Sequence, residues 1–281
     1  MMGLLAAAAL GGAINAVAGG GTLVTFPALL AFGTPPIIAN ATSTLALVIG
    51  TSGGIYGFRQ HLAAIRPWLW RFVPISLLGG LVGSILLTFT SNRTFSKLVP
   101  FLILFATILF LAQGALRRFA QTHLNRNHTG SVARSQTGSE ERDSGEQSLG
   151  DGIADPIRQS ALLAAIVFQF VVAVYGGYFG AGIGILMLAS LGLIGLRHIH
   201  EMNALKTILG SLINLVAAVW FIRAGLIHWP KAGVMVLGAV TGYYLGSHYS
   251  QRISQTSVRR IITFIGLALS AWTFYQQFLR P

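Results

Sequence analysis

The sequence predicts an all-α integral membrane protein that contains two repeats of one transmembrane unit. First, 53% of its 281 residues are hydrophobic and only 9% are charged, with a mean hydropathy of +0.68, whereas soluble globular domains carry about 25% charged residues. Second, the predominantly apolar stretches 68–89, 98–116 and 261–278 approach or exceed the roughly 20 residues that cross a bilayer. Third, the two halves of the chain match each other in register.

The charged residues are distributed as in a membrane protein rather than a nucleic-acid-binding protein. Six of the seven acidic residues lie in the segment 120–156, and Glu201 is the only one elsewhere. The basic residues outside that segment stand near the ends of apolar stretches, which membrane topology explains. The chain has no cysteine, which excludes disulfides, zinc–thiolate clusters and iron–sulfur centres. We expect a lipid bilayer as partner, and no nucleic acid, cofactor or metal ion.

Residues 120–156 are expected to form a disordered polar linker. They are rich in Ser, Gly, Gln, Asn, Arg and Glu, so they bury too little apolar area to offset the entropy of ordering. The chain is therefore divided into a first membrane repeat at 1–119, the linker at 120–156, and a second membrane repeat at 157–281. The N-terminal apolar run follows no basic residues, so we interpret it as the first membrane element and not as a cleaved signal.

The two repeats align without gaps when the sequence is shifted by 163 positions. Internal repeats of this kind are typical of secondary transporters. The shift superimposes the glycine run 18–21 on 181–184, Asn40-Ala41 on Asn203-Ala204, Phe58 on Phe221, Pro67 on Pro230, and Gly79, Gly83 and Ser84 on Gly242, Gly246 and Ser247.

Each half is predicted to contain one glycine-broken apolar segment (4–32 and 160–195) and three helices (39–58, 68–90 and 95–116; 203–222, 232–250 and 259–278). A straight helix of 36 residues would be roughly 54 Å long, too long for one crossing, so we favour a hairpin that turns at the glycines. Three crossings plus a hairpin per half would make the repeats inverted. The positive-inside rule allows this arrangement, with 13 of the 19 Lys and Arg on the linker side, and also a single crossing per broken segment, with 12.

The glycine breaks are the first candidate site. Non-helical backbone at membrane depth is tolerated where it is buried in protein or lines a wet cavity, and a half-helix that begins there directs its N–H groups and positive dipole end at that cavity. Close helix packing through small residues is the alternative explanation. The two runs are Ala18-Gly19-Gly20-Gly21-Thr22 and Gly180-Ala181-Gly182-Ile183-Gly184.

Polar side chains on one face of the following helix are the second candidate site. Intramembrane polar groups are costly unless they face a partner or a cavity, so these side chains either bind substrate or form hydrogen bonds between packed helices. Lys206 holds an anion, or it extends to the membrane interface and screens Glu201. The residues are Asn40, Ser43, Thr44 and Thr51, with Asn203, Lys206, Thr207 and Asn214 at the matching positions.

The cargo is expected to be anionic. No carboxylate lies deep in a predicted span, whereas proton pumps and sodium-coupled cation carriers usually place Asp or Glu there. An intramembrane serine protease is a weaker alternative. It rests on Gly50-Thr51-Ser52-Gly53, but all seven histidines fall in loops or near helix ends, where none can act as its base.

At these residues the sequence resembles the TauE/SafE family of sulfite exporters and four-toluene-sulfonate uptake permeases. The resemblance implies a multi-pass transporter of the bacterial inner membrane for sulfur-containing anions such as sulfite or organosulfonates. It also implies that the glycine breaks and the Asn-Ala helices form the substrate region. The segments that carry it are 12–21 (GAINAVAGGG), 27–30 (PALL), 39–43 (ANATS) and, more weakly, 176–184 (GGYFGAGIG).

We therefore predict a secondary transporter of small anions, with a non-transporting scaffold or receptor and a cation channel as alternatives. No enzymatic activity is expected, and no ATP-binding motif is present. Homo-oligomerisation is left open. The predicted substrate-binding residues are Asn15, Gly19, Gly20, Gly21, Thr22, Asn40, Ser43, Thr44, Gly180, Gly182, Gly184, Asn203, Lys206 and Thr207.

Overall fold

The computed structural model describes residues 1–17, 19–57, 62–112, 156–193, 199–249 and 255–279, and these form helices and short turns without a strand. The predicted linker lies outside the described residues except at Pro156. The helices are α1 (Met2–Val17), α2 (Thr22–Ala31), α3 (Pro36–Gly57), α4 (Leu62–Phe89), the helix Asn92–Ala112, α6 (Pro156–Tyr178), α7 (Ile183–Leu193), α8 (Ile199–Arg223), α9 (Trp229–Tyr249) and α10 (Gln255–Phe274), which continues as the π-helix η2 (Tyr275–Leu279).

Several helices have the character of membrane segments. Three of them are long and apolar enough to cross a bilayer by length and composition: Ile65–Phe89, Asn92–Ala112 and Ala204–Arg223. Other helices are apolar but have shorter qualifying segments, among them α1 and α2. Many large apolar side chains are exposed, including Phe89, Leu237 and Phe264. Such a surface is unusual for a soluble monomer and fits an integral membrane protein.

All six predicted straight helices begin three to six residues earlier than expected, and two of these starts illustrate the difference. α3 begins at Pro36 rather than at residue 39, because proline is favourable in the first helical position, where no backbone donor is needed. α4 begins at Leu62 rather than at residue 68 and contains Pro67 and Pro74. Each internal proline removes one backbone hydrogen bond, and the remaining helix accommodates that loss.

Both glycine-containing segments are interrupted at their glycines. α1 ends at Val17 and α2 begins at Thr22, while α6 ends at Tyr178 and α7 begins at Ile183. Positive φ values occur at Gly19 (68°), Gly20 (132°), Gly180 (80°) and Gly182 (78°). Glycine adopts such angles without the steric penalty that a Cβ brings, which explains why the chain turns at these positions.

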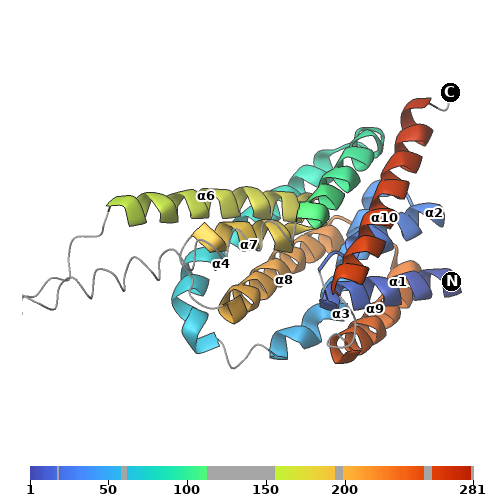
Figure 1. The fold of residues 1–281 in the computed structure, drawn as a ribbon. Coiled ribbons are helices and arrows are strands. Elements are labelled where there is room, and N and C mark those ends of the chain that lie inside the picture. Colours follow the sequence, from blue (N-terminus) through green and yellow to red (C-terminus); the bar gives the residue numbers. More distant parts are fainter. Residues whose placement is uncertain (18, 58–61, 113–155, 194–198, 250–254, 280–281) are drawn as a thin grey trace, which may run out of the picture.

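The helices of the two halves interlock. α1 packs along α9, and α4 packs along α6 (Figure 1). Both contacts are close because glycines face backbone: a Cβ at Gly242 would collide with the carbonyl of Ala9, and one at Gly83 with the carbonyl of Val174. Each of the two tight pairs therefore contains one helix from each half.

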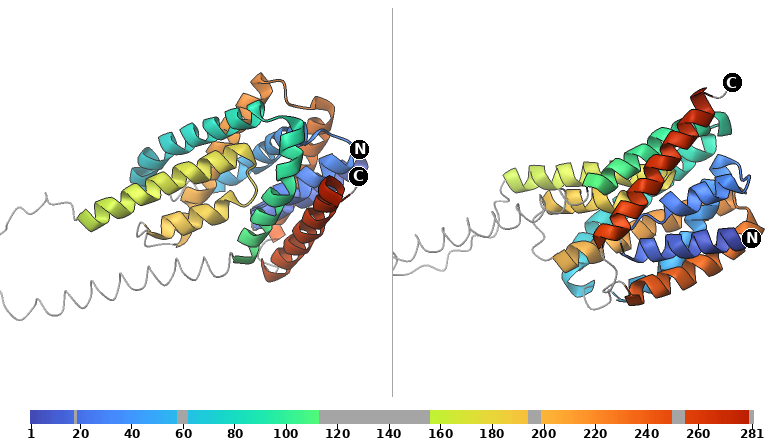
Figure 2. Two further views of the ribbon diagram at one scale, coloured as in Figure 1. Left: turned by 90° about the horizontal axis from the view of Figure 1, so that it is seen from above. Right: turned by 45° about the vertical axis from the view of Figure 1, so that its right-hand side comes forward.

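The ends of the chain lie at the same end of the molecule, as the views in Figures 1 and 2 show. The turn between α8 and α9 lies there too, because Lys231 Nζ donates hydrogen bonds to Phe32 O (2.9 Å) and Thr34 Oγ1 (2.8 Å) in the turn between α2 and α3. We call this end the turn side. α6 begins at the opposite end, which we call the linker side (Figure 1).

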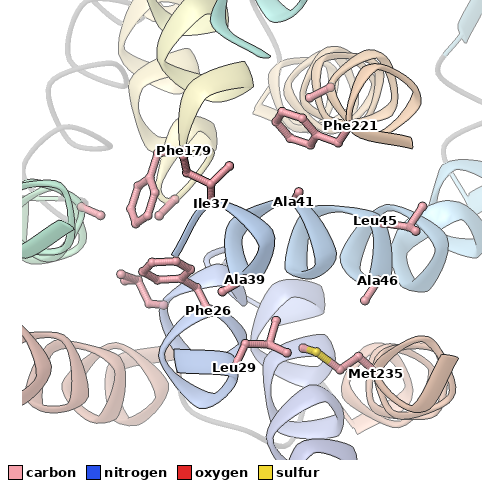
Figure 3. Close-up of a cluster of buried hydrophobic side chains, with 14 of the residues drawn as sticks. Phe26, Leu29, Ile37, Ala39, Ala41, Leu45, Ala46, Phe179, Phe221 and Met235 are labelled. Atoms are coloured by element: carbon pink, nitrogen blue, oxygen red, sulfur yellow. The ribbon is translucent and has the colours of Figure 1, made fainter. Parts of the chain in front are cut away.

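The larger hydrophobic core joins the two halves around α2 and α3. Figure 3 shows Phe26 of α2 and Phe179 beside the first turns of α3, with Phe221 and Met235 approaching from α8 and α9. A second core lies between α4, α6, α7 and α8 and includes Phe72. The two glycine turns and the polar face of α3 are thus held by packed helices of both halves.

Candidate functional site

The first glycine turn is held by the helix that precedes it. Asn15, at the end of α1, accepts a hydrogen bond from the backbone N–H of Gly20 through its Oδ1 atom (3.0 Å). A Cβ at Gly20 would collide with the ring of Phe110, and one at Gly21 with the carbonyl of Gly11. A Cβ at Gly19, by contrast, would have no atom of the described part of the chain within 4 Å. The turn is therefore tightly packed on one side and open on the other.

The second glycine turn is closed by Tyr175. The backbone N–H groups of Phe179 and Gly180 both donate to Tyr175 O, and the Tyr175 hydroxyl donates to Ala181 O (2.8 Å). α7 then begins at Ile183, directly after Gly182.

Both turns rest on one face of the helix Asn92–Ala112. A Cβ at Gly182 would lie 3.5 Å from Leu109 Cδ1 and 3.8 Å from Ala106 Cα, and Gly20 faces Phe110. Positions 106, 109 and 110 share a helical face because they are three and four residues apart. The structure therefore brings the two predicted glycine sites to the same region of the molecule, from which α2 and α7 both begin.

The polar face of α3 is buried and makes specific hydrogen bonds. Asn40, 1% exposed, donates from Nδ2 to Tyr178 O at the end of α6 (3.0 Å), while its Oδ1 is buried without a hydrogen-bond partner. Ser43 Oγ lies 2.6 Å from Thr25 Oγ1 of α2, and Thr44 Oγ1 donates to Asn40 O (2.9 Å). Asn40 and Ser43 thus form the interhelical hydrogen bonds that were one of the two explanations for this face.

The polar face of α8 lies beside the second glycine turn. A Cβ at Gly184 would lie 3.3 Å from Lys206 Cδ, with Cγ and Cε both at 3.7 Å, so the lysine stem runs along the first turn of α7. Asn214 Oδ1 would lie 3.4 Å from a Cβ at Gly180. Lys206 and Thr207 are half-buried. Asn203 belongs to α8, but its side chain lies outside the described residues.

The two halves have different chemistry at corresponding positions. In the first half, Thr25 and Ser43 join the beginning of α2 to α3 through their hydroxyl groups. The shift of 163 positions places Leu188 and Lys206 there in the second half. The first half therefore carries neutral hydroxyl groups at these positions, and the second half carries a cation beside the start of α7.

Four aromatic residues near these turns were not among the predicted site residues. Phe26 and Phe179 have ring centroids 5.4 Å apart, and Phe95 lies 6.3 Å from Phe26, 5.7 Å from Tyr178 and 6.4 Å from Phe179, all edge to face. In an apolar sequence, single aromatic residues are indistinguishable from core or lipid-facing ones. The role of Tyr178 O was also unpredictable, because every residue has a carbonyl.

Within the described residues, the protease-like tetrapeptide shows no catalytic arrangement. Ser52 is exposed and donates from Oγ to Ile49 O of its own helix (2.8 Å). Among the residues that the structure describes, no group of three or more His, Asp and Glu side chains is placed to hold a metal ion.

Comparisons with known proteins extend over nearly the whole chain. The family described as "Sulfite exporter TauE/SafE" matches residues 4–273. The chain is similar to a "Probable membrane transporter protein" of Haemophilus influenzae, with 28% identity over 94% of this chain and 90% of the relative. It is also similar to the "Probable membrane transporter protein YfcA" of Escherichia coli, with 25% identity over 95% of this chain and 87% of the relative. No solved structure matches the chain.

Proposed function

Because this chain belongs to the sulfite exporter TauE/SafE family, we propose that it is a secondary transporter that carries a small sulfur-containing anion across the membrane. The family and the transporter names of its relatives support a membrane transporter and not an enzyme. The finer assignment, to sulfite or an organosulfonate, follows the family's name. We place the protein in the bacterial inner membrane, as a multi-pass carrier.

The observation that carries this proposal is the convergence of both glycine turns on the face of Ala106, Leu109 and Phe110. Two half-helices, α2 and α7, begin at these turns. Some of their first backbone N–H groups donate to the glycine turns themselves, as Leu23 N–H does to Gly20 O and Ile185 N–H to Gly182 O. The helix dipole still places a partial positive charge at the beginning of each half-helix. Together they supply a field that favours an anion without a formal charge.

Lys206 strengthens that field. Its stem lies along the start of α7 at Gly184, so a full positive charge is held near the positive end of a helix dipole. A negative charge near this point is therefore electrostatically favourable. Glu201 is the only carboxylate outside 120–156, and it lies at the beginning of α8, in the first turn. A bound anion would offset the lysine and the dipole together.

The helix positions support inverted repeats. α3 begins at Pro36 and α8 at Ile199, and Asn92–Ala112 and α10 begin at residues 92 and 255, so both pairs are separated by the 163 positions of the sequence repeat. The turn that follows α8 adjoins the first two turns of α3, because the backbone N–H of His228 donates to Thr42 Oγ1 (3.1 Å). We infer that corresponding helices run in opposite directions, as in many secondary transporters.

The packing favours moving units that contain helices of both halves. If one whole repeat rocked against the other, the glycine contacts of α1 with α9 and of α4 with α6 would have to break. In contrast, the group α1, α3 and α9 meets the group α4, α6 and α8 mainly where α3 packs on α8. We propose that these two groups move relative to each other and that the polar faces of α3 and α8 line the path between them.

Flux into proteoliposomes tests the proposal. Radiolabelled sulfite and a small organosulfonate are offered to purified protein, and Lys206→Met is compared with Lys97→Met, which removes a lysine from an exposed position. We expect anion uptake by the wild type and by Lys97→Met. For Lys206→Met we expect an increase in KM of about tenfold, corresponding to a lost charge-assisted contact.

Other outcomes would identify the alternatives. A scaffold or receptor predicts no flux of any solute, and a cation channel predicts a current carried by Na⁺ or K⁺. If sulfite and sulfonates are not transported but another anion is, the assigned cargo is wrong and the carrier mechanism stands. Equal effects of Lys206→Met and Lys97→Met on KM would contradict the proposed role of Lys206.

A further inference from the structure

The four aromatic residues Phe26, Phe95, Tyr178 and Phe179 form a continuous cluster, which we call the aromatic plug. Every ring contact that joins them is edge to face, with centroid separations from 5.4 to 6.4 Å. Phe26, Phe95 and Phe179 are at most 1% exposed. Such contacts add attraction beyond the apolar area that they bury, so the plug resists opening.

The plug lies between the second glycine turn and the turn side of the molecule. Phe179 directly follows the last residue of α6 and precedes the glycine turn. Phe95 lies in the first turn of the helix Asn92–Ala112, and the Tyr178 hydroxyl lies 3.3 Å from Thr90 Oγ1, in the turn before that helix. The plug therefore closes the region around the second glycine turn toward the turn side.

The plug also spans the two groups of helices that we propose to move. Phe26 belongs to α2, which packs on α1 and α3, whereas Tyr178 ends α6 in the other group. Figure 3 shows Phe26 and Phe179 facing each other across this boundary. The hydrogen bond from Asn40 to Tyr178 O crosses the same boundary beside the plug. Separation of the two groups would break these contacts together.

The positions that match the plug residues in the sequence repeat do not encode a second aromatic cluster. Under the shift of 163 positions, these four residues correspond to Ala189, Val258, Asn15 and Ala16. These side chains are small, and Asn15 instead holds the first glycine turn. Beside that turn, the position that a Cβ at Gly19 would occupy is open. The two halves thus have corresponding helices, but the aromatic plug has no counterpart at the matching positions.

We propose that the aromatic plug is a gate that closes the transport path toward the turn side, and that no matching aromatic cluster closes the side toward the linker. Opening toward the turn side requires separation of four packed rings, whereas the matching positions of the other half encode no aromatic residue. The resting protein therefore favours access from the linker side. The proposal rests on the proposed carrier function and adds to it a direction of resting access.

Cysteine labelling tests the gate, because the chain has no native cysteine. The reporter is Thr207→Cys, a half-buried position on the polar face of α8. A membrane-impermeant maleimide is applied to right-side-out and inside-out vesicles. Sidedness is assigned with Ser139→Cys in the linker sequence and Ala224→Cys, an exposed position in the turn between α8 and α9. Labelling needs no substrate, so the gate and the carrier function can fail separately.

We expect the reporter to react with the maleimide at least about tenfold faster from the linker side than from the turn side. The added substitutions Phe95→Ala and Phe179→Ala should raise the turn-side rate by about tenfold, because the attraction within an edge-to-face pair corresponds to a rate change of about that size. The matched control is Phe101→Ala with Phe274→Ala, an edge-to-face pair at the exposed surface (6.3 Å), which should leave both rates unchanged.

Three results would overturn the gate. Equal reporter rates from both sides without the plug substitutions would remove the asymmetry. An unchanged turn-side rate in a plug variant that elutes as a folded monodisperse species would show that the rings are not the barrier. Equal effects of the control pair would indicate general loosening. If the double variant does not fold, Phe179→Leu alone is used, and it must raise the turn-side rate above that of Phe101→Leu.

Discussion

The side-chain amide of Asn40 donates a hydrogen bond to the backbone carbonyl of Tyr178 (3.0 Å), and so joins α3 of the first half to the last residue of α6 in the second. The carbonyls of the last helical turn have no partners within the helix. Asn40 therefore caps the broken helix of the opposite half at the point where the second glycine turn begins. Through this contact, a polar residue on α3 fixes the position of that turn.

This relationship predicts that Asn40→Asp is more damaging than Asn40→Ala. Alanine leaves Tyr178 O buried without its donor, at a cost of about 1–3 kcal/mol in the free energy of unfolding. A carboxylate at the same place brings two acceptors together in a buried region, which adds a desolvation cost. Thermal unfolding in detergent measures the order, with Asn92→Ala as an exposed control that loses one contact to Ile37 N (3.3 Å). Equal melting temperatures for the two Asn40 variants would contradict the assigned geometry.

The hydroxyl pair of Thr25 and Ser43 is predicted to couple α2 to α3 energetically. The two oxygen atoms lie 2.6 Å apart, and both residues are fully buried. A double-mutant cycle with Thr25→Val and Ser43→Ala should give a coupling of about 1 kcal/mol. Thr25→Val removes the hydroxyl that faces Ser43, whereas Ser43→Ala leaves Thr25 Oγ1 its hydrogen bond to Gly21 O (3.0 Å). Urea or thermal unfolding of the four proteins provides the cycle. Strict additivity would mean that the pair contributes nothing to the position of the first half-helix.

The helical membrane character and the glycine turns could be predicted because both depend on local sequence. Apolar length and scarce charge are enough to predict membrane helices, and a run such as Gly19-Gly20-Gly21 indicates a place where φ can be positive. The start of α4 was predicted less well, because the expected helix began at residue 68 whereas α4 begins at Leu62 and contains Pro67.

Which helices touch could not be predicted from the repeat alone. The shift of 163 positions shows that Gly79 and Gly83 correspond to Gly242 and Gly246, but it does not show that each pair faces the first helix of the other half. The polar face of α3 was identified correctly as a face, yet the partner of Asn40 is a backbone carbonyl distant in sequence. Such contacts depend on three-dimensional packing, which single residue types do not encode.

The two glycines Gly242 and Gly233 of α9 are predicted to respond in opposite directions to alanine. A Cβ at Gly242 would collide with the carbonyl of Ala9 in α1, whereas one at Gly233 would have no atom within 4 Å. Gly242→Ala should destabilise the protein by about 1–3 kcal/mol through overpacking. Gly233→Ala should be neutral or stabilise it by up to about 1 kcal/mol through helix propensity. Thermal stability of both variants in the same detergent is the measurement. A loss of stability in both would show that glycine matters here for flexibility rather than for close approach.

The neighbouring glycines of the first turn are predicted to differ in the same way when each is replaced by asparagine. Gly19 has φ 68°, with open space where a Cβ would lie, and asparagine visits this left-handed region more readily than most residues. Gly19→Asn should therefore cost no more than about 1 kcal/mol and retain anion flux. Gly20 has φ 132°, and its Cβ would collide with the ring of Phe110.

Gly20→Asn should consequently lose both stability and flux. Its side chain would be strained at φ 132° and would collide with the ring of Phe110. The combination of Gly20→Ala with Phe110→Leu separates these two causes. Leucine relieves the collision with the ring but not the strain of a Cβ at φ 132°, so we expect only partial recovery of the melting temperature. Full recovery would assign the requirement for glycine to packing against Phe110 alone. A Gly19→Asn variant as damaged as Gly20→Asn would contradict the prediction and would show that the open side of the first glycine turn must stay clear.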